Sequence, residues 1–121
     1  MNRTEKYRNW RTEYRSVYEK FVERYLPSPP SNPVKIAILD TGIDRDHALL
    51  EAREDNLKGK KNLYNTSQKN VPDTNGHGTF AASLILDYAP DTALYAVKIA
   101  DKENARPDAN IVAEVSIQAT R

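Results

Sequence analysis

The sequence contains no cysteine. Disulfides, thiolate metal sites and a cysteine nucleophile are therefore excluded, and the composition fits a reducing compartment. Long apolar runs are also absent, and none approaches the roughly 20 residues that a membrane-spanning helix needs. The first twenty residues have no apolar signal core and mix Glu with Arg, so neither a secretory nor a mitochondrial leader is expected. These absences predict an intracellular protein, or a piece of one, that does not enter a membrane.

Neither charge sign is in clear excess. The 18 Lys and Arg residues nearly balance the 17 Asp and Glu residues, which gives a formal charge of +1. This balance argues against nucleic acid or an anionic membrane as an obligatory partner. With 121 residues and a hydrophobic content of 39%, the chain has the length of one domain with a modest core.

Three segments follow one another along the chain. Residues 1–26 are predicted to form an amphipathic helix, because apolar side chains recur at three- and four-residue steps from residue 3 onward. We interpret its apolar stripe as a face packed on the neighbouring domain; the alternative is a docking face for a partner protein. Residues 27–33 are a stiff Pro-rich linker. The compact domain is predicted to occupy residues 34–121.

This domain alternates predicted strands and helices. Residues 34–40 form an apolar run rich in β-branched side chains, which predicts a parallel strand buried on both faces. The other predicted elements are a short helix at 48–55, a short strand at 62–64, a helix at 77–86, a buried strand at 92–100 and a last helix at 110–120. This order predicts an α/β fold with a parallel sheet and a right-handed crossover. Two or three strands make an incomplete sheet, so low stability or aggregation is expected.

Asp40 ends the first strand, and an ionised carboxylate in that position needs a partner. The best candidate is His77, which opens the helix predicted at 77–86. The dipole of that helix disfavours an imidazolium at its start, and a carboxylate on the other ring nitrogen restores the balance and fixes the tautomer. Gly76 and Gly78 have no side chains, which leaves room for the close approach of a substrate or a partner loop. The sequence therefore predicts a proton-transferring pair made of Asp40 and His77.

The motifs at Val34–Asp44, Gly76–Thr79 and Ala93–Lys98 resemble successive landmarks of the subtilisin-like serine peptidases. The resemblance covers residues 34–120. It implies a partial three-layer α/β domain, with a mostly parallel sheet between helices, and endopeptidase cleavage of proteins through an acyl-enzyme. In such an enzyme Asp40 would orient His77, and His77 would act as general base and acid.

The resemblance does not supply the nucleophile. The serine of the family lies far downstream in a Gly-Thr-Ser-Met-Ala-like turn, whereas no serine of this chain is flanked by glycine. Ser83 lies roughly 9 Å of helical rise from His77, too far to bond its imidazole. The oxyanion Asn is also absent. The expectation is a chain that is inactive alone and meets protein or peptide substrates only if a C-terminal part completes it. The alternative is a non-enzymatic, decayed peptidase fragment that acts as a protein-interaction module.

Parts of the sequence also fit two further enzyme classes. Residues 38–42 also resemble the Asp-Thr-Gly turn of aspartic peptidases, but Ile43 replaces the usual Ser or Ala, and the predicted helices do not suit that all-β fold. A metal hydrolase could be assembled from four oxygen and nitrogen donors, although their spacing is not tight. These donors are Asp40, Asp44, His47 and His77.

No metal and no cofactor is expected. Leu49 stands where many subtilisin-like peptidases place a calcium-binding carboxylate. Asp44 is interpreted as a cap for the loop that follows it; the alternative is a carboxylate that supports the catalytic pair or faces the substrate. His47 is interpreted as a structural or solvent-exposed residue rather than a ligand.

Overall fold

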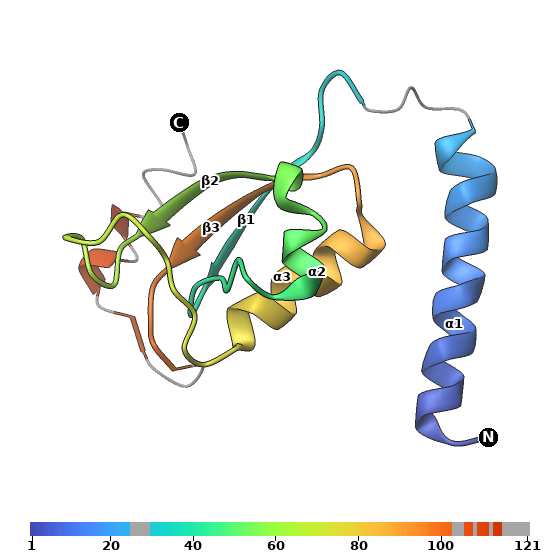
Figure 1. The fold of residues 1–121 in the computed structure, drawn as a ribbon, viewed down its shortest axis with the longest axis horizontal. Helices are drawn as coiled ribbons and strands as arrows, with labels where there is room; N and C mark the ends of the chain where they lie inside the picture. The colour runs from blue at the N-terminus through green and yellow to red at the C-terminus, as the bar shows by residue number, and fades with distance from the viewer. Residues whose placement is uncertain (25–29, 103–105, 108, 112, 115–121) are drawn as a thin grey trace. The chain divides into compact units, whose positions relative to one another are not determined.

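The computed structural model describes residues 1–24, 30–102, 106–107, 109–111 and 113–114. The chain divides into two compact units, Met1–Pro33 and Val34–Arg121 (Figure 1).

The first unit is a long helix. Its α-helical part, α1, spans Arg3–Val17 and passes into a π-helical segment, η1, at Tyr18–Glu23. The side chain of Asn2 accepts a hydrogen bond from the Glu5 amide at 2.9 Å, and the Glu5 carboxylate accepts one from the Asn2 amide at 2.9 Å, which forms a capping box. The prediction of a helix is confirmed as far as Glu23, and residues 25 and 26 lie outside the described part.

The second unit is built on a parallel sheet. Its strands are β1 (Lys35–Asp40), β2 (Leu57–Asn62) and β3 (Ala93–Lys98). They lie in the order β1-β3-β2, and both pairings are parallel. The predicted α/β fold with a parallel sheet is therefore confirmed, and the strand predicted at 92–100 lies at its centre.

One face of the sheet is covered by α2 (Ala48–Glu51) and α3 (His77–Tyr88), as Figure 1 shows. Apolar side chains of both layers meet in the core, which comprises Ile38, Ile43, Leu50, Val71, Ala82, Leu86, Leu94 and Ala96. Successive side chains of a strand point to opposite faces, so Ala37 and Leu39 of β1 point away from this core, and both are exposed. The prediction that the first strand is buried on both faces is therefore wrong: in the described structure, the side chains on one face of β1 pack in the core and those on the other face are exposed.

The second strand was misplaced by the sequence pattern. The prediction put a short strand at 62–64, whereas β2 runs over Leu57–Asn62 and follows a 3₁₀ turn at Glu54–Asn56. Its residues at 58, 60 and 61 are exposed lysines, because β2 is the other edge strand and borders solvent. An edge strand of this kind has no apolar periodicity to detect. Most of the last predicted helix, at 110–120, lies outside the described residues.

Candidate active site

The carboxyl end of β1 and the first turn of α3 bring Asp40 and His77 together. Asp40 is the last residue of β1, and His77 is the first residue of α3. The Nδ1 atom of His77 lies 2.9 Å from each carboxylate oxygen of Asp40. The Asp40 side chain is 16% exposed and the His77 side chain 51%, so the carboxylate is held in the protein while the ring reaches solvent. The contact expected from the sequence is present.

The Asp40 carboxylate is oriented by its own chain. The amide of Thr41 donates a hydrogen bond to Oδ1 of Asp40 at 2.7 Å. The Asp40 carbonyl accepts a hydrogen bond from the Ile99 amide at 2.9 Å, just beyond the end of β3. These two hydrogen bonds therefore hold both the backbone and the side chain of Asp40 at the carboxyl end of β1.

Asp73 is a residue of this site that the sequence pattern did not single out. Its Oδ1 atom accepts hydrogen bonds from the Thr41 hydroxyl at 2.7 Å, the Gly76 amide at 2.9 Å and the Asn75 amide at 3.2 Å. Its Oδ2 atom accepts the Thr79 amide at 2.9 Å and the Thr79 hydroxyl at 2.5 Å. One carboxylate thus receives five hydrogen bonds from the segments that carry Asp40 and His77.

These contacts explain the acidity of Asp73. Partial burial opposes ionisation of the carboxyl and would raise its pKa, but the hydrogen bonds outweigh that effect. The donors are the Thr79 hydroxyl, the Gly76 amide, the Thr41 hydroxyl and the Thr79 amide. Together they lower the pKa of Asp73 from its ordinary value of 3.8 to about 2.

The hydroxyls of Thr41 and Thr79 extend this hydrogen-bond network between the segment after Asp40 and the first turn of α3. The Thr41 hydroxyl, which follows Asp40, accepts a hydrogen bond from the Gly78 amide at 3.0 Å in the first turn of α3. The Thr79 hydroxyl, which lies in α3, accepts one from the Asp44 amide at 2.9 Å. Each hydroxyl therefore donates to Asp73 and accepts from the other half of the site.

Lys98 anchors the loop that leads to Asp73. Its ammonium group donates to the Pro72 carbonyl at 2.6 Å and to the Asp101 carboxylate at 2.8 Å, and the residue is 3% exposed. The Lys98 nitrogen also lies 5.7 Å from the centre of the Tyr64 ring. Hydrogen bonds from Lys98 and from Tyr64 lower the pKa of Asp101, and the bond to Asp101 raises the pKa of Tyr64.

The other residues named from the sequence have local contacts. Asp44 accepts a hydrogen bond from the Asp46 amide at 3.0 Å, which is a cap of its own loop. His47 is exposed and begins α2, where its Nδ1 atom accepts from the Leu49 amide at 3.4 Å. Among the residues that the structure describes, no three His, Asp or Glu side chains gather in a way that would hold a metal ion. The four donors considered for a metal hydrolase are therefore not assembled.

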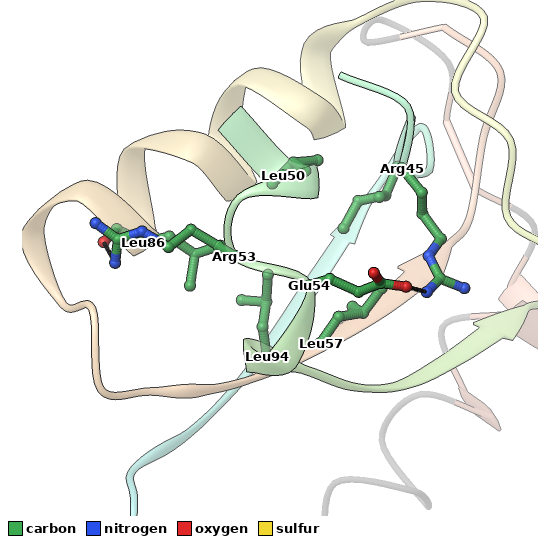
Figure 2. A pocket seen from close by; sticks show the side chains of 8 residues that line it. Arg45, Leu50, Arg53, Glu54, Leu57, Leu86 and Leu94 are labelled. Carbon is green, nitrogen blue, oxygen red and sulfur yellow. Dashed lines mark hydrogen bonds and ion pairs between the residues drawn. The ribbon is translucent and has the colours of Figure 1, made fainter. Parts of the chain in front are cut away.

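A small apolar hollow lies between α2, α3 and the sheet (Figure 2). It is lined by Leu50, Leu86 and Leu94, and the ion pair of Arg45 with Glu54, 2.6 Å long, lies beside it. Its volume of about 10 Å³ is close to the minimum for one water molecule. Neither member of the Asp40–His77 pair lines it, so this hollow is a packing gap and not a substrate pocket.

In the described part of the chain, no helix has both the length and the apolar character that crossing a bilayer requires.

Comparison with known proteins gives a consistent set of matches. A sequence model of the subtilase family matches residues 31–116. The subtilisin of Bacillus pumilus is 35% identical over 77 residues, which are 56% of this chain and 26% of that protein. An intracellular serine protease of Paenibacillus polymyxa is 33% identical over 84 residues, which are 60% of this chain and 25% of that protein. A subtilisin-like protease of Arabidopsis thaliana is 37% identical over 73 residues, which are 6% of its length. The chain thus spans about a quarter or less of these curated relatives.

Proposed function

Because the chain belongs to the subtilase family, we propose that Asp40 and His77 are the carboxylate and the imidazole of a serine endopeptidase triad. The contact of His77 Nδ1 with both oxygens of Asp40 is the observation that carries this proposal. An imidazole held through Nδ1 directs Nε2 toward a reacting group. Its exposure fits this role, because a substrate and a nucleophile must reach the ring.

The chemistry follows from the two ring nitrogens. Nε2 of His77 takes the proton of a serine hydroxyl as the serine oxygen attacks the carbonyl carbon of a peptide bond. The same proton then passes to the nitrogen of the leaving amine, and water repeats the sequence to release the acyl group. Asp40 keeps its negative charge throughout and stabilises the imidazolium that forms in each step. Proteins and peptides are the substrates that this chemistry implies.

The serine of the triad comes, in this proposal, from outside the 121 residues. Two serine hydroxyls of the domain are engaged elsewhere: Ser83 donates to the Phe80 carbonyl at 2.8 Å, and Ser67 donates to the Asn65 side chain at 2.6 Å. A nucleophilic serine must instead lie about 2.6–3.2 Å from the imidazole. The chain alone is therefore proposed to be inactive.

A chimera tests the pair. The part of this chain that matches the subtilase family model, residues 31–116, replaces the corresponding part of the Bacillus pumilus subtilisin, and hydrolysis of a chromogenic peptide is measured. The folded chimera is expected to be active. His77→Ala should lower kcat by about 10⁴-fold or more, because the general base is lost. The matched control is His47→Ala, which removes the second histidine of the chain and should keep the activity.

A folded chimera without activity, or one that His77→Ala leaves unchanged, contradicts the proposal. The first of these results favours the alternative, a peptidase fragment that serves as a protein-interaction module. The unmodified 121-residue chain should also remain unlabelled by a fluorophosphonate probe, which reacts with activated serines. Labelling of that chain would show that one of its own serines is a nucleophile.

A further inference from the structure

The carboxylate of Asp73 lies between two segments that are far apart in sequence. Thr41 donates to it from a position 32 residues earlier, next to Asp40. Gly76 and Thr79 donate to it from the two sides of His77. The same carboxylate therefore bonds to the neighbours of both members of the proposed catalytic pair.

We propose that Asp73 is a positioning residue, which holds the His77 imidazole against Asp40 through the hydroxyls of Thr41 and Thr79. This inference rests on the proposed function, because it assigns the residue that sets the geometry of that pair. Asp73 acts through its neighbours, and no reacting atom needs to touch it.

A simple turn cap would not need these hydroxyls. The Asn75 and Gly76 amides, two and three residues after Asp73, are the donors that an Asp receives in an ordinary local turn. The Thr41 hydroxyl donates to Asp73 across the site and accepts a hydrogen bond from the Gly78 amide, so it links Asp73 to the first turn of α3. The Thr79 hydroxyl makes the converse connection from α3 to the Asp44 amide.

The charge of Asp73 strengthens these connections. Hydrogen bonds to an ionised carboxylate are shorter and stronger than those between neutral groups. The low pKa of Asp73 keeps this group ionised throughout the pH range in which an imidazole titrates. The connection between the two segments is therefore constant while His77 gains and loses its proton.

The test follows the titration of the two imidazoles by NMR in the full 121-residue chain. The sequence has two histidines, so His77 is measured beside an internal reference, His47. Asp40→Asn removes the negative partner of His77 and should lower its titration midpoint by about 1 pH unit or more. Asp73→Asn should lower the same midpoint by about half as much, because the ring is held less closely against Asp40. His47 should not move in either variant.

Asp73→Asn also removes a negative charge near His77, and this loss alone would lower the titration midpoint of His77. Substitutions that change no charge therefore distinguish an effect of ring position from an effect of charge. Thr41→Val removes the bridging hydroxyl without changing any charge, and Thr41→Ser keeps it. We expect Thr41→Val to shift His77 in the same direction as Asp73→Asn, and Thr41→Ser to leave it in place. Asp44→Asn, which removes one negative charge from the adjacent exposed loop, should shift it little.

The outcomes distinguish the two proposals. If Asp40→Asn does not move His77, the pair itself is not coupled, and the proposed function loses its basis together with this inference. If Asp40→Asn moves His77 but Thr41→Val does not, the pair stands and the positioning role of Asp73 is overturned. Should Asp73→Asn fail to fold by circular dichroism, Thr79→Val against Thr79→Ser replaces it and is judged by the same criterion.

Discussion

Gly78, in the first turn of α3, packs directly against the backbone of Gly42, two residues beyond Asp40. A β-carbon on Gly78 would overlap the Gly42 carbonyl oxygen and lie 3.1 Å from the Gly42 nitrogen. Gly42 has a φ of +115° and is itself enclosed, since a β-carbon there would lie 2.5 Å from the Val71 carbonyl oxygen and 2.6 Å from that of Pro72. The distance between the segments that carry Asp40 and His77 thus depends on two glycines in backbone contact.

Gly78→Ala is therefore expected to destabilise the domain by about 3 kcal/mol, because the obstacle is backbone that cannot rotate away. Urea unfolding followed by circular dichroism measures the change. The matched control is Gly76→Asn: Gly76 has a φ of +98°, but a β-carbon there meets nothing within 4 Å. Asn enters left-handed backbone conformations more readily than most L-residues, so the strain of this substitution should cost only about 1 kcal/mol. Equal effects of the two substitutions would contradict the close approach.

Acid should weaken the domain through Asp73. The folded-state pKa of about 2 lies below the ordinary value of 3.8, so ionised Asp73 stabilises the fold above pH 3.8. That contribution declines as the pH falls through about 2. Allowing for partial exposure, it amounts to roughly 1–2 kcal/mol.

Because other carboxylates titrate in the same range, the difference between the wild type and Asp73→Asn is the quantity to follow. Urea unfolding at pH 6, 4, 3 and 2 measures it. The wild type should be the more stable protein at pH 6, and the difference should shrink toward pH 2. A difference that does not change with pH would show that Asp73 is not strongly acidic in the folded state.

The contact between Asp40 and His77 was predictable because each residue stands at a recognisable boundary. An apolar run that stops at a carboxylate marks a strand end, and a histidine between glycines before a small, aliphatic run marks a helix start. The parallel order of the strands followed from the same alternation of patterns. These features are local in sequence, so they can be recognised in a single amino-acid sequence.

The hydrogen bonds of Asp73 were not predictable in this way, because the donor that links it to the Asp40 segment is distant in sequence. Residues 71–76 have the composition of an ordinary turn. Nothing in them indicates that Asp73 accepts a hydrogen bond from the Thr41 hydroxyl, 32 residues earlier in the sequence. The signal that could have drawn attention to it is the pair of threonines, each placed next to a motif residue. The position of β2 was missed for a different reason, since the lysines of an edge strand do not follow an apolar period.

Lys98 should stabilise the site although its burial has a cost. Lys98→Met keeps the bulk of the side chain but removes the bond to the Pro72 carbonyl, so the loop that leads to Asp73 loses an anchor. We expect a loss of about 1–2 kcal/mol in urea unfolding. Lys58→Met, on the exposed part of β2, should change stability by less than about 0.5 kcal/mol. A Lys98→Met variant as stable as the wild type would show that burial of the ammonium cancels its hydrogen bonds.

The edge position of β1 predicts self-association. In the described part of the chain β1 pairs with β3 alone, and an apolar strand with an unpaired edge is a template for other chains. Leu39 is 40% exposed on this strand, whereas its neighbour Ile38 is 8% exposed and points into the core. Leu39→Lys should therefore lower light scattering at a given protein concentration and leave the circular dichroism spectrum unchanged. Ile38→Lys, the matched control, should unfold the domain because it buries an unpaired charge. Equal scattering by the wild type and Leu39→Lys would mean that this part of β1 does not mediate the association.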